Sequence, residues 1–307
     1  MGQIPHSQLE KSRANGSAKQ PSQPRGSPSL PDVCDELRHK VTAFLEEKTD
    51  DKRIRNVQSR VRVSMGVIEE ALSRYGPDQL SLSYNGGKDC LVLLVLILAC
   101  LPVWAGASSR AEPNAGSSPN STDNTAAAAD TPASQQPPSG AGASAPQGYP
   151  QKIHAVYVVS PHPFPEVEDF VEKTAQQYHL DLKRYDLPMK AALEVYLGER
   201  KSVRAVFVGT RRTDPHGEFL KHFDPTDDGW PRFMRVHPVI DWHYAEVWAF
   251  IRHLDIPFCV LYNRGFTSLG GMNDTHRNPA LALDQPGKFR PAYELMDDEE
   301  ERLGRDR

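Results

Sequence analysis

The sequence predicts an α/β protein with a doubly wound, mostly parallel sheet. Between residues 80 and 208, short apolar runs typical of buried strands alternate with longer segments of helical periodicity. A polar segment with two glycines follows the first of these runs, and a second polar segment follows the last. In a parallel sheet the carboxyl ends of the strands form one edge, where ligands bind, so both polar segments are expected there.

The amino-terminal part predicts a tail followed by two amphipathic helices. Residues 1–30 are basic and rich in Ser and Pro, so we expect a disordered tail. Residues 32–48 and 51–75 are expected to be helical, and apolar side chains recur at helical spacing in the second segment. Gly76-Pro77-Asp78 should end that helix, and residues 80–84 form the first strand candidate.

Residues 88–101 predict a helix with almost no polar face, which should therefore be buried. The apolar run of residues 91–104 is too short to cross a bilayer. Residues 105–150 are almost all small or polar, and we expect a disordered surface insertion there. A regulatory segment is the alternative for this stretch.

The alternating pattern resumes after the insertion. Strands are expected at residues 153–159, 181–185 and 203–208, and helices at residues 165–178 and 188–200. The tail and the insertion leave roughly 230 residues that can pack, which favours one domain over residues 31–307. This domain should carry helical amino-terminal and irregular carboxy-terminal extensions.

Composition excludes several functional classes. The net charge is −4 and the pI is about 6.3, which argues against nonspecific nucleic-acid binding. The four cysteines form no C-x-x-C pair, which argues against structural zinc and a disulfide framework. Free thiols fit a reducing compartment. We expect a cytoplasmic monomer without a secretory signal or a membrane span, and a minor mitochondrial pool is the alternative for localisation.

The segment from Asn85 to Asp89 has the chemistry of a phosphate-binding loop. Gly86 and Gly87 allow a tight turn and a close approach to an anion. The helix that follows would direct free N–H groups and the positive end of its dipole into the loop. Lys88 adds a positive charge, whereas Asp89 would repel a bare phosphate, so a Mg²⁺ ion between them is the natural interpretation. A plain strand–helix turn is the alternative.

The run Ser83-Tyr84-Asn85-Gly86-Gly87-Lys88-Asp89 resembles the pyrophosphate-binding loop of the adenine-nucleotide α-hydrolase superfamily. Members of that superfamily split ATP between the α and β phosphates or bind related adenylyl compounds. The resemblance implies adenylyl chemistry without naming the acceptor.

Further motifs follow in order: residues 209–215 (GTRRTDP), 226–233 (TDDGWPRF), 238–242, 244–248, 261–270, 291–295 and 301–305. Together with the loop they resemble the eukaryotic, fungal-type FAD synthases, which are single-function FMN adenylyltransferases related to PAPS reductases. The resemblance covers residues 60–101 and 151–305. It implies Mg²⁺-dependent transfer of AMP from ATP to the phosphate of FMN, which gives FAD and pyrophosphate.

The resemblance also implies roles for particular residues. The metal ligands would be Asn85, Asp89 and Asp214, which together with Lys88 form the catalytic set. The ATP site would contain Gly86, Gly87 and Lys88, with Arg211 and Arg212 near the phosphates and Val158 near the adenine. The flavin site would contain Asp227, Trp230, Pro231, Phe233, Arg302 and Arg305.

Each assignment has a simpler alternative. Asp214 could start a turn before Pro215, and Arg211 and Arg212 could be solvated loop charges. Arg302 and Arg305 could be a helical charge pair that follows an acidic run, residues 297–301, which we expect to face solvent.

Three aromatic residues, Trp242, Tyr244 and Trp248, are expected on one helix, where core packing is the favoured interpretation. At the level of function, a PAPS or APS reductase, a sulfate-adenylylating subunit and a non-catalytic nucleotide or flavin binder are the alternatives. A reductase needs a nucleophilic cysteine late in the chain. Here the last cysteine is Cys259, which lies within an apolar run.

Overall fold

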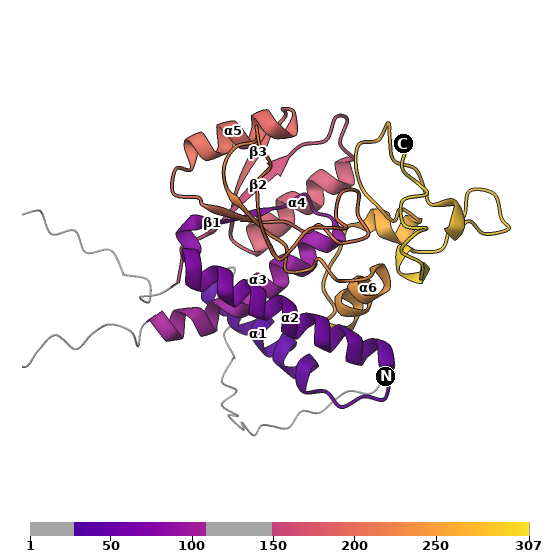
Figure 1. Cartoon of the computed structure of the whole chain (residues 1–307). Helices are drawn as coiled ribbons and strands as arrows, with labels where there is room; N and C mark the ends of the chain where they lie inside the picture. The colour runs from indigo at the N-terminus through magenta and orange to yellow at the C-terminus, as the bar shows by residue number, and fades with distance from the viewer. Residues whose placement is uncertain (1–27, 109–148, 307) are drawn as a thin grey trace, which may run out of the picture.

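The computed structural model describes residues 28–108 and 149–306, in which six strands form one sheet (Figure 1). The strand order is β3-β2-β1-β4-β6-β5, and every neighbouring pair is parallel except β5 and β6. The predicted doubly wound, mostly parallel sheet is confirmed. The strands are β1 (Leu80–Ser83), β2 (Ile153–Val158), β3 (Leu180–Tyr185), β4 (Ala205–Phe207), β5 (Phe223–Pro225) and β6 (Met234–Val236).

Six α-helices surround this sheet in the described part of the chain. They are α1 (Leu30–Glu46), α2 (Lys52–Tyr75), α3 (Lys88–Ser108), α4 (Pro165–Gln177), α5 (Met189–Glu199) and α6 (Tyr244–His253). Short 3₁₀ turns occupy Pro77–Gln79, Val260–Arg264, Pro279–Leu281 and Ala292–Glu294.

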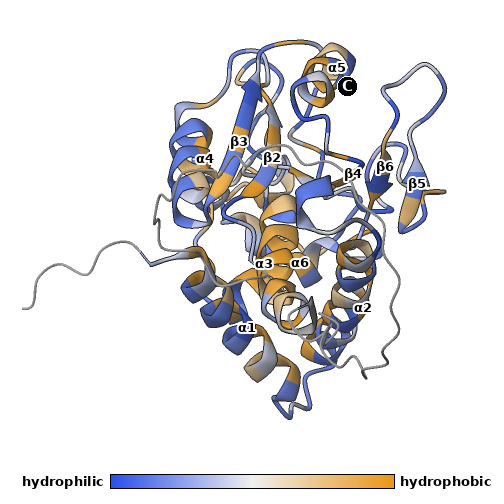
Figure 2. Cartoon of the chain, turned by 90° about the vertical axis from the view of Figure 1, so that its left-hand side faces the viewer, coloured by the Kyte–Doolittle hydropathy of each residue, from blue (hydrophilic) through white to orange (hydrophobic). Residues whose placement is uncertain are grey.

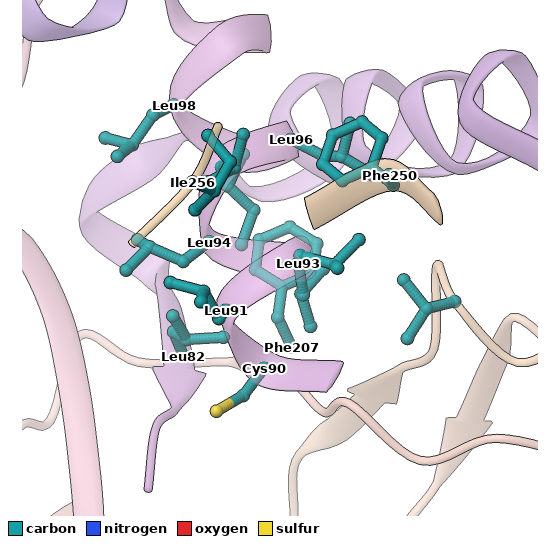
Figure 3. Packing of buried hydrophobic residues seen from close by; sticks show 14 of the residues in the cluster. Leu82, Cys90, Leu91, Leu93, Leu94, Leu96, Leu98, Phe207, Phe250 and Ile256 are labelled. Carbon is teal, nitrogen blue, oxygen red and sulfur yellow. The ribbon is translucent and has the colours of Figure 1, made fainter. Parts of the chain in front are cut away.

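Helix α3 is the centre of the molecule, and Figure 2 shows it as an almost uniformly hydrophobic helix. Figure 3 shows Leu91 and Leu93 of α3 packed in one cluster with Leu82 of β1. By length and composition the segment Lys88–Gly106 could cross a membrane. However, 72% of the 18-residue apolar stretch within it is buried inside the structure. The buried helix expected from the sequence is therefore confirmed, and it extends seven residues past its predicted end at residue 101.

Two predicted boundaries are wrong. Helix α1 begins at Leu30, inside the predicted tail, because Ser29 accepts a hydrogen bond from the Asp32 backbone and Leu30 is buried. Helix α3 runs to Ser108, inside the predicted insertion, and Ala105 is buried. Composition alone hid both ends, because Leu30 stands between Ser29 and Pro31 and Ala105 stands at the start of a stretch of small residues. Residues 1–27 and 109–148 lie outside the described residues, so disorder there stays a prediction.

Strands β5 and β6 are absent from the sequence-based prediction. Each has only three residues, and β5 contains a proline, so neither shows a usable periodicity. Trp242 precedes α6, whereas it was expected on that helix. Trp242, Tyr244 and Trp248 are all buried in the core, which confirms packing as their role.

The two faces of the sheet are covered differently. Leu82 and Phe207 belong to the large core that also contains residues of α1, α2, α3, α4 and α6. On the other face α5 is the described helix that packs, and it forms a small cluster with Val156 and Val206 (Figure 1). Helix α5 contacts β2, and its Leu193 and Tyr196 belong to the same cluster as Val206 of β4. A cavity lies beside α5 and is lined by Val206 of β4 and Arg235 of β6.

The chain changes direction at strand β1. From β1 it proceeds through β2 to β3 at one side of the sheet, and then returns to β4 on the other side of β1. The loops after β1 and β4 therefore flank the topological switch point, where open α/β sheets bind ligands. The sequence motifs at residues 85–89 and 209–215 lie in these two loops.

We expect the domain to fold without residues 109–148. Their replacement by a ~20-residue Gly/Ser linker, with a reach of about 25 Å, should leave the thermal unfolding midpoint within about 2 °C of the parent value. Deletion of residues 105–150 is the matched comparison, since it also removes the buried Ala105 and the packed Tyr149. This second variant should unfold several degrees lower by circular dichroism. Equal midpoints for the two variants would contradict the boundary at Ser108.

Candidate active site

The loop after β1 is held in place by its own side chains and by a distant tyrosine. Gly86 has a φ of 74°, and a Cβ there would lie 2.8 Å from Val171 Cγ2 of α4, so no other residue fits without strain. The Gly87 backbone donates a hydrogen bond to Asn85 Oδ1 at 3.0 Å. The Lys88 backbone donates to the Tyr262 hydroxyl at 2.9 Å. The first turn of α3 is thereby fixed at the switch point.

A buried charge cluster joins this loop to two other segments. Lys88 Nζ lies 2.9 Å from Asp89 Oδ2 and 2.5 Å from Glu301 Oε1. Arg211, which is completely buried, has its Nε atom 2.9 Å from Asp89 Oδ1 and also pairs with Glu301. Asp298 lies 3.5 Å from the same guanidinium. Ion pairs thus connect the β1 loop, the β4 loop and the carboxy-terminal segment.

The cluster fixes the charge state of its members. Burial would lower the pKa of Lys88, but the carboxylates of Asp89 and Glu301 outweigh burial and hold this pKa above its ordinary value. Burial would raise the pKa of Asp89, but Arg211 and Lys88 together hold it below its ordinary value. Lys88 and Asp89 are therefore both ionised at neutral pH.

The first cavity, of about 240 Å³, opens above the loop and is mainly polar. It brings together seven residues predicted for the site, which are Asn85, Gly87, Lys88, Asp89, Asp214, Arg302 and Arg305. Residues from the β1 loop, the β4 loop and the carboxy-terminal segment meet here, in the arrangement that an anionic substrate requires.

The second cavity, of about 280 Å³, lies beside α5 on the face of the sheet that carries the smaller cluster. Its wall is mostly apolar and includes Leu193, Val206 and Phe233. The predicted flavin residues Asp227 and Trp230 also line it. Ser83, Val208 and Thr210 line both cavities, so the two spaces adjoin at the carboxyl ends of β1 and β4.

Five predicted site residues line neither cavity: Gly86, Val158, Arg211, Arg212 and Pro231. Gly86 packs against α4, and Arg211 lies within the charge cluster. Arg212 pairs with Asp241 and donates to two loop carbonyls. Pro231 accepts from the Thr226 hydroxyl, and Val158 ends β2. A role of these residues in substrate contact stays a prediction.

Arg302 and Arg305 differ in their surroundings. Residues 301–304 form turns, so the alternative of a helical charge pair is wrong. Arg305 lies 3.3 Å from the Asp274 carboxylate and is packed over Gly270. Arg302 makes no side-chain hydrogen bond or ion pair within residues 28–108 and 149–306, and it lines the first cavity. Its guanidinium is therefore available to a ligand.

Asp214 has the turn role that was its simpler alternative, since its Oδ2 accepts from the Arg211 backbone at 2.8 Å. It still lines the first cavity, so the two interpretations are compatible.

The sequence analysis missed Glu301 as part of the site. It placed the acidic run of residues 297–301 in solvent, whereas Glu301 is only 4% exposed and contacts both Lys88 and Arg211. The pairing spans 213 positions from Lys88, so no local pattern could reveal it. Tyr262 lay within a recognised motif, but its hydrogen bond to the loop was not foreseen.

Comparisons with known proteins agree with this geometry. Residues 187–277 match the family model of the phosphoadenosine phosphosulfate reductase domain. A probable FAD synthase of Schizosaccharomyces pombe is 33% identical over 274 residues, which are 89% of each chain. The flavin adenine dinucleotide synthase of Saccharomyces cerevisiae is 31% identical over 260 residues, 81% of this chain and 76% of the relative.

A solved structure of an FMN adenylyltransferase is also similar to this chain. Candida glabrata FMN adenylyltransferase, in complex with FMN and an ATP analogue, superimposes with a TM-score of 0.74 at 26% identity. The match covers 91% of this chain and 97% of that structure. The identity to the S. pombe relative over nearly the whole of both chains shows that this chain belongs to the FAD synthase family.

Proposed function

We propose that this protein is a FAD synthase that transfers AMP from ATP to the phosphate of FMN and releases pyrophosphate. The observation that carries this proposal is the pair of adjoining cavities. One is polar and built on a phosphate loop, and the other is apolar and flanked by Trp230. The C. glabrata enzyme has been solved with FMN and an ATP analogue, and also with FAD and pyrophosphate, which supports two substrate sites of this kind.

The reaction is a nucleophilic substitution at the α-phosphorus of ATP. A phosphate oxygen of FMN forms the new bond to phosphorus, and the bond to the oxygen bridging the α and β phosphates breaks as pyrophosphate leaves. The second pKa of a phosphate monoester is near 6, so FMN is already largely a dianion at pH 7 and needs no general base. Catalysis then rests on in-line placement and on neutralised charge, with orientation contributing as much as ~10 kcal/mol.

The chain supplies groups for in-line placement and for charge neutralisation. The phosphate loop and the first turn of α3 line the first cavity, and Lys88 provides an ammonium group whose position is fixed by Asp89 and Glu301. The shared wall at Ser83 and Thr210 would place the FMN phosphate beside the α phosphate of ATP. Arg302 offers a free cation at the same cavity.

The residues present fit a Mg²⁺ ion bound together with ATP. Asn85, Asp89 and Asp214 contribute an amide oxygen and two carboxylates to one cavity. Asp89 Oδ1 is buried and accepts no hydrogen bond from the described residues, although Arg211 lies beside it. The described chain has no group of three or more His, Cys, Asp and Glu side chains suited to a metal, so phosphate oxygens would complete the ligand set. Bound there, Mg²⁺ would neutralise charge on the phosphates.

A reductase function finds no support in the last cysteine. Cys259 is buried, with its Sγ 3.7 Å from the Glu166 carbonyl oxygen, and burial raises the pKa of its thiol. A protonated, enclosed thiol is a poor nucleophile. All four cysteines are free and buried, which supports our further proposal that the enzyme works in the reducing cytoplasm.

The proposed activity has a direct test. The purified chain should convert FMN and ATP to FAD and pyrophosphate when Mg²⁺ is present, as read by chromatography, and chelation of Mg²⁺ with EDTA should stop the reaction. A folded protein that consumes ATP without FAD, or forms no FAD under these conditions, would refute the assignment.

We expect Asp89→Asn to reduce kcat about 10²–10³-fold while the circular dichroism spectrum is retained. The amide keeps the shape of the side chain but removes a carboxylate from the phosphate loop and from the proposed metal site. Asp228→Asn is the matched control, because Asp228 is fully exposed and pairs only with exposed Arg232. Near-normal turnover in folded Asp89→Asn would remove Asp89 from the chemistry.

We expect Arg302→Ala to raise the KM for FMN about tenfold and to change the KM for ATP little. FMN brings two negative charges to a cavity in which Lys88 is already paired with carboxylates. Arg302→Lys should recover part of the loss, because it keeps the charge without the planar fork. Lys288→Ala, which removes an exposed cation outside both cavities, should behave as the parent protein. An equal increase in both KM values would place Arg302 at the ATP side.

A further inference from the structure

The wall of the second cavity includes a buried histidine, His237. His237 follows β6, lines the cavity and is 1% exposed. Neither ring nitrogen makes a hydrogen bond of normal geometry in the described part of the chain, although the Val208 carbonyl lies near the ring. A buried polar group without a partner destabilises the fold, so its presence in a mostly apolar wall requires a reason.

The fold explains why the imidazole points into the cavity. Side chains alternate along a strand, and Val236 enters the main core while Arg235 and His237 line the second cavity. The His237 backbone is fixed by a hydrogen bond to the His222 carbonyl at 2.9 Å, and its own carbonyl contacts His222 Nδ1 at 3.0 Å. The backbone is therefore satisfied, and only the ring is left without a hydrogen bond of normal geometry.

The ring is neutral at physiological pH. Burial is the main reason that the pKa of His237 falls to about 4, and the nearby charges of Arg235 and His222 lower it further. Asp224 and the Val208 carbonyl oppose this shift. A neutral imidazole carries one donor and one acceptor, so it can complement the polar edge of an uncharged heterocycle without bringing a charge into the cavity.

We propose that His237 is a positioning residue that hydrogen-bonds the polar pyrimidine edge of the flavin ring in the second cavity. The inference rests on the proposed function. Trp230 and Phe233 offer flat apolar surface to a ring, and the cavity opens toward the phosphate loop at Ser83 and Thr210. The chain that carries the phosphate leaves the central ring of the flavin, so the pyrimidine edge lies to one side of that chain. His237 follows β6 at the same edge of the sheet as Ser83 and Thr210, where it can meet this edge. A hydrogen bond there would set how far the ring enters, and so where the FMN phosphate lies.

The test compares His237→Leu with His237→Asn. Leucine fills the space without polar atoms, whereas asparagine keeps a donor and an acceptor. We expect the Kd for FMN, measured by quenching of flavin fluorescence, to rise roughly tenfold in His237→Leu and to stay within about threefold in His237→Asn. The Kd for a non-hydrolysable ATP analogue should be unchanged in both. His253→Gln is the control, since His253 lies on α6 and lines neither cavity.

Thermal unfolding separates a positioning role from a structural one. If the imidazole serves the ligand, its replacement by leucine should keep or raise the midpoint of the free protein, because an unpaired buried polar group disappears. The folded-state pKa lies below the ordinary value of 6.5, so parent stability should fall as the pH drops from about 6.5 toward 4, and His237→Leu should lose less. A lower midpoint with unchanged FMN affinity would overturn the proposal.

The remaining outcomes are also decisive. Weaker binding of the ATP analogue with unchanged FMN affinity would assign the second cavity to adenine and overturn the proposal. Unchanged FMN affinity in His237→Leu, in an enzyme that still forms FAD, would refute the role of His237 alone. A parent protein that neither binds FMN nor forms FAD would instead refute the proposed function.

Discussion

The pairing of Lys88 and Arg211 with Asp89 and Glu301 is the interaction on which the site depends. These four side chains are largely or completely withdrawn from solvent and come from segments that lie far apart in the sequence. Removal of one partner from a buried ion pair typically costs 3–5 kcal/mol, because the other charge stays buried without compensation. The cluster therefore forms only when the β1 loop, the β4 loop and the carboxy-terminal segment are all in place. Assembly of the first cavity is thereby coupled to folding of the whole domain.

The charge balance of this cluster bears on substrate binding. Its two cations face Asp89 and Glu301, and Asp214 and Asp298 add two more carboxylates beside Arg211. The cluster is net negative before ATP and FMN add their phosphates, so further positive charge is required. Arg302, which lacks a partner among the described side chains, is one source, and the proposed Mg²⁺ is the other. This balance explains how a protein with a net charge of −4 can act on two anionic substrates.

The sequence predicted the parts of the fold that depend on local periodicity. The buried strand before Asn85, the apolar helix after it and the alternating elements from residue 153 to residue 208 are all present near their expected bounds. Strands β5 and β6 could not be predicted, because three residues show no pattern and their position depends on pairing with β4. Glu301 was missed for a related reason, since its burial is decided by Lys88 and Arg211 rather than by its acidic neighbours. The local sequence pattern therefore predicted the phosphate loop. The distant residues that hold this loop in place were identified only in the structure.

The position of the long insertion follows from the same topology. Helix α3 begins at the phosphate loop and runs 21 residues, so its end at Ser108 lies about 30 Å from the site. The chain re-enters the sheet at Ile153, the first residue of β2, and β2 is parallel to β1. Both junctions are therefore at the edge of the sheet opposite the carboxyl ends of β1 and β4. The β1 loop and the β4 loop, which line the first cavity, lie at the other edge, so an insertion between these junctions can vary in length and composition without changing the geometry of these loops.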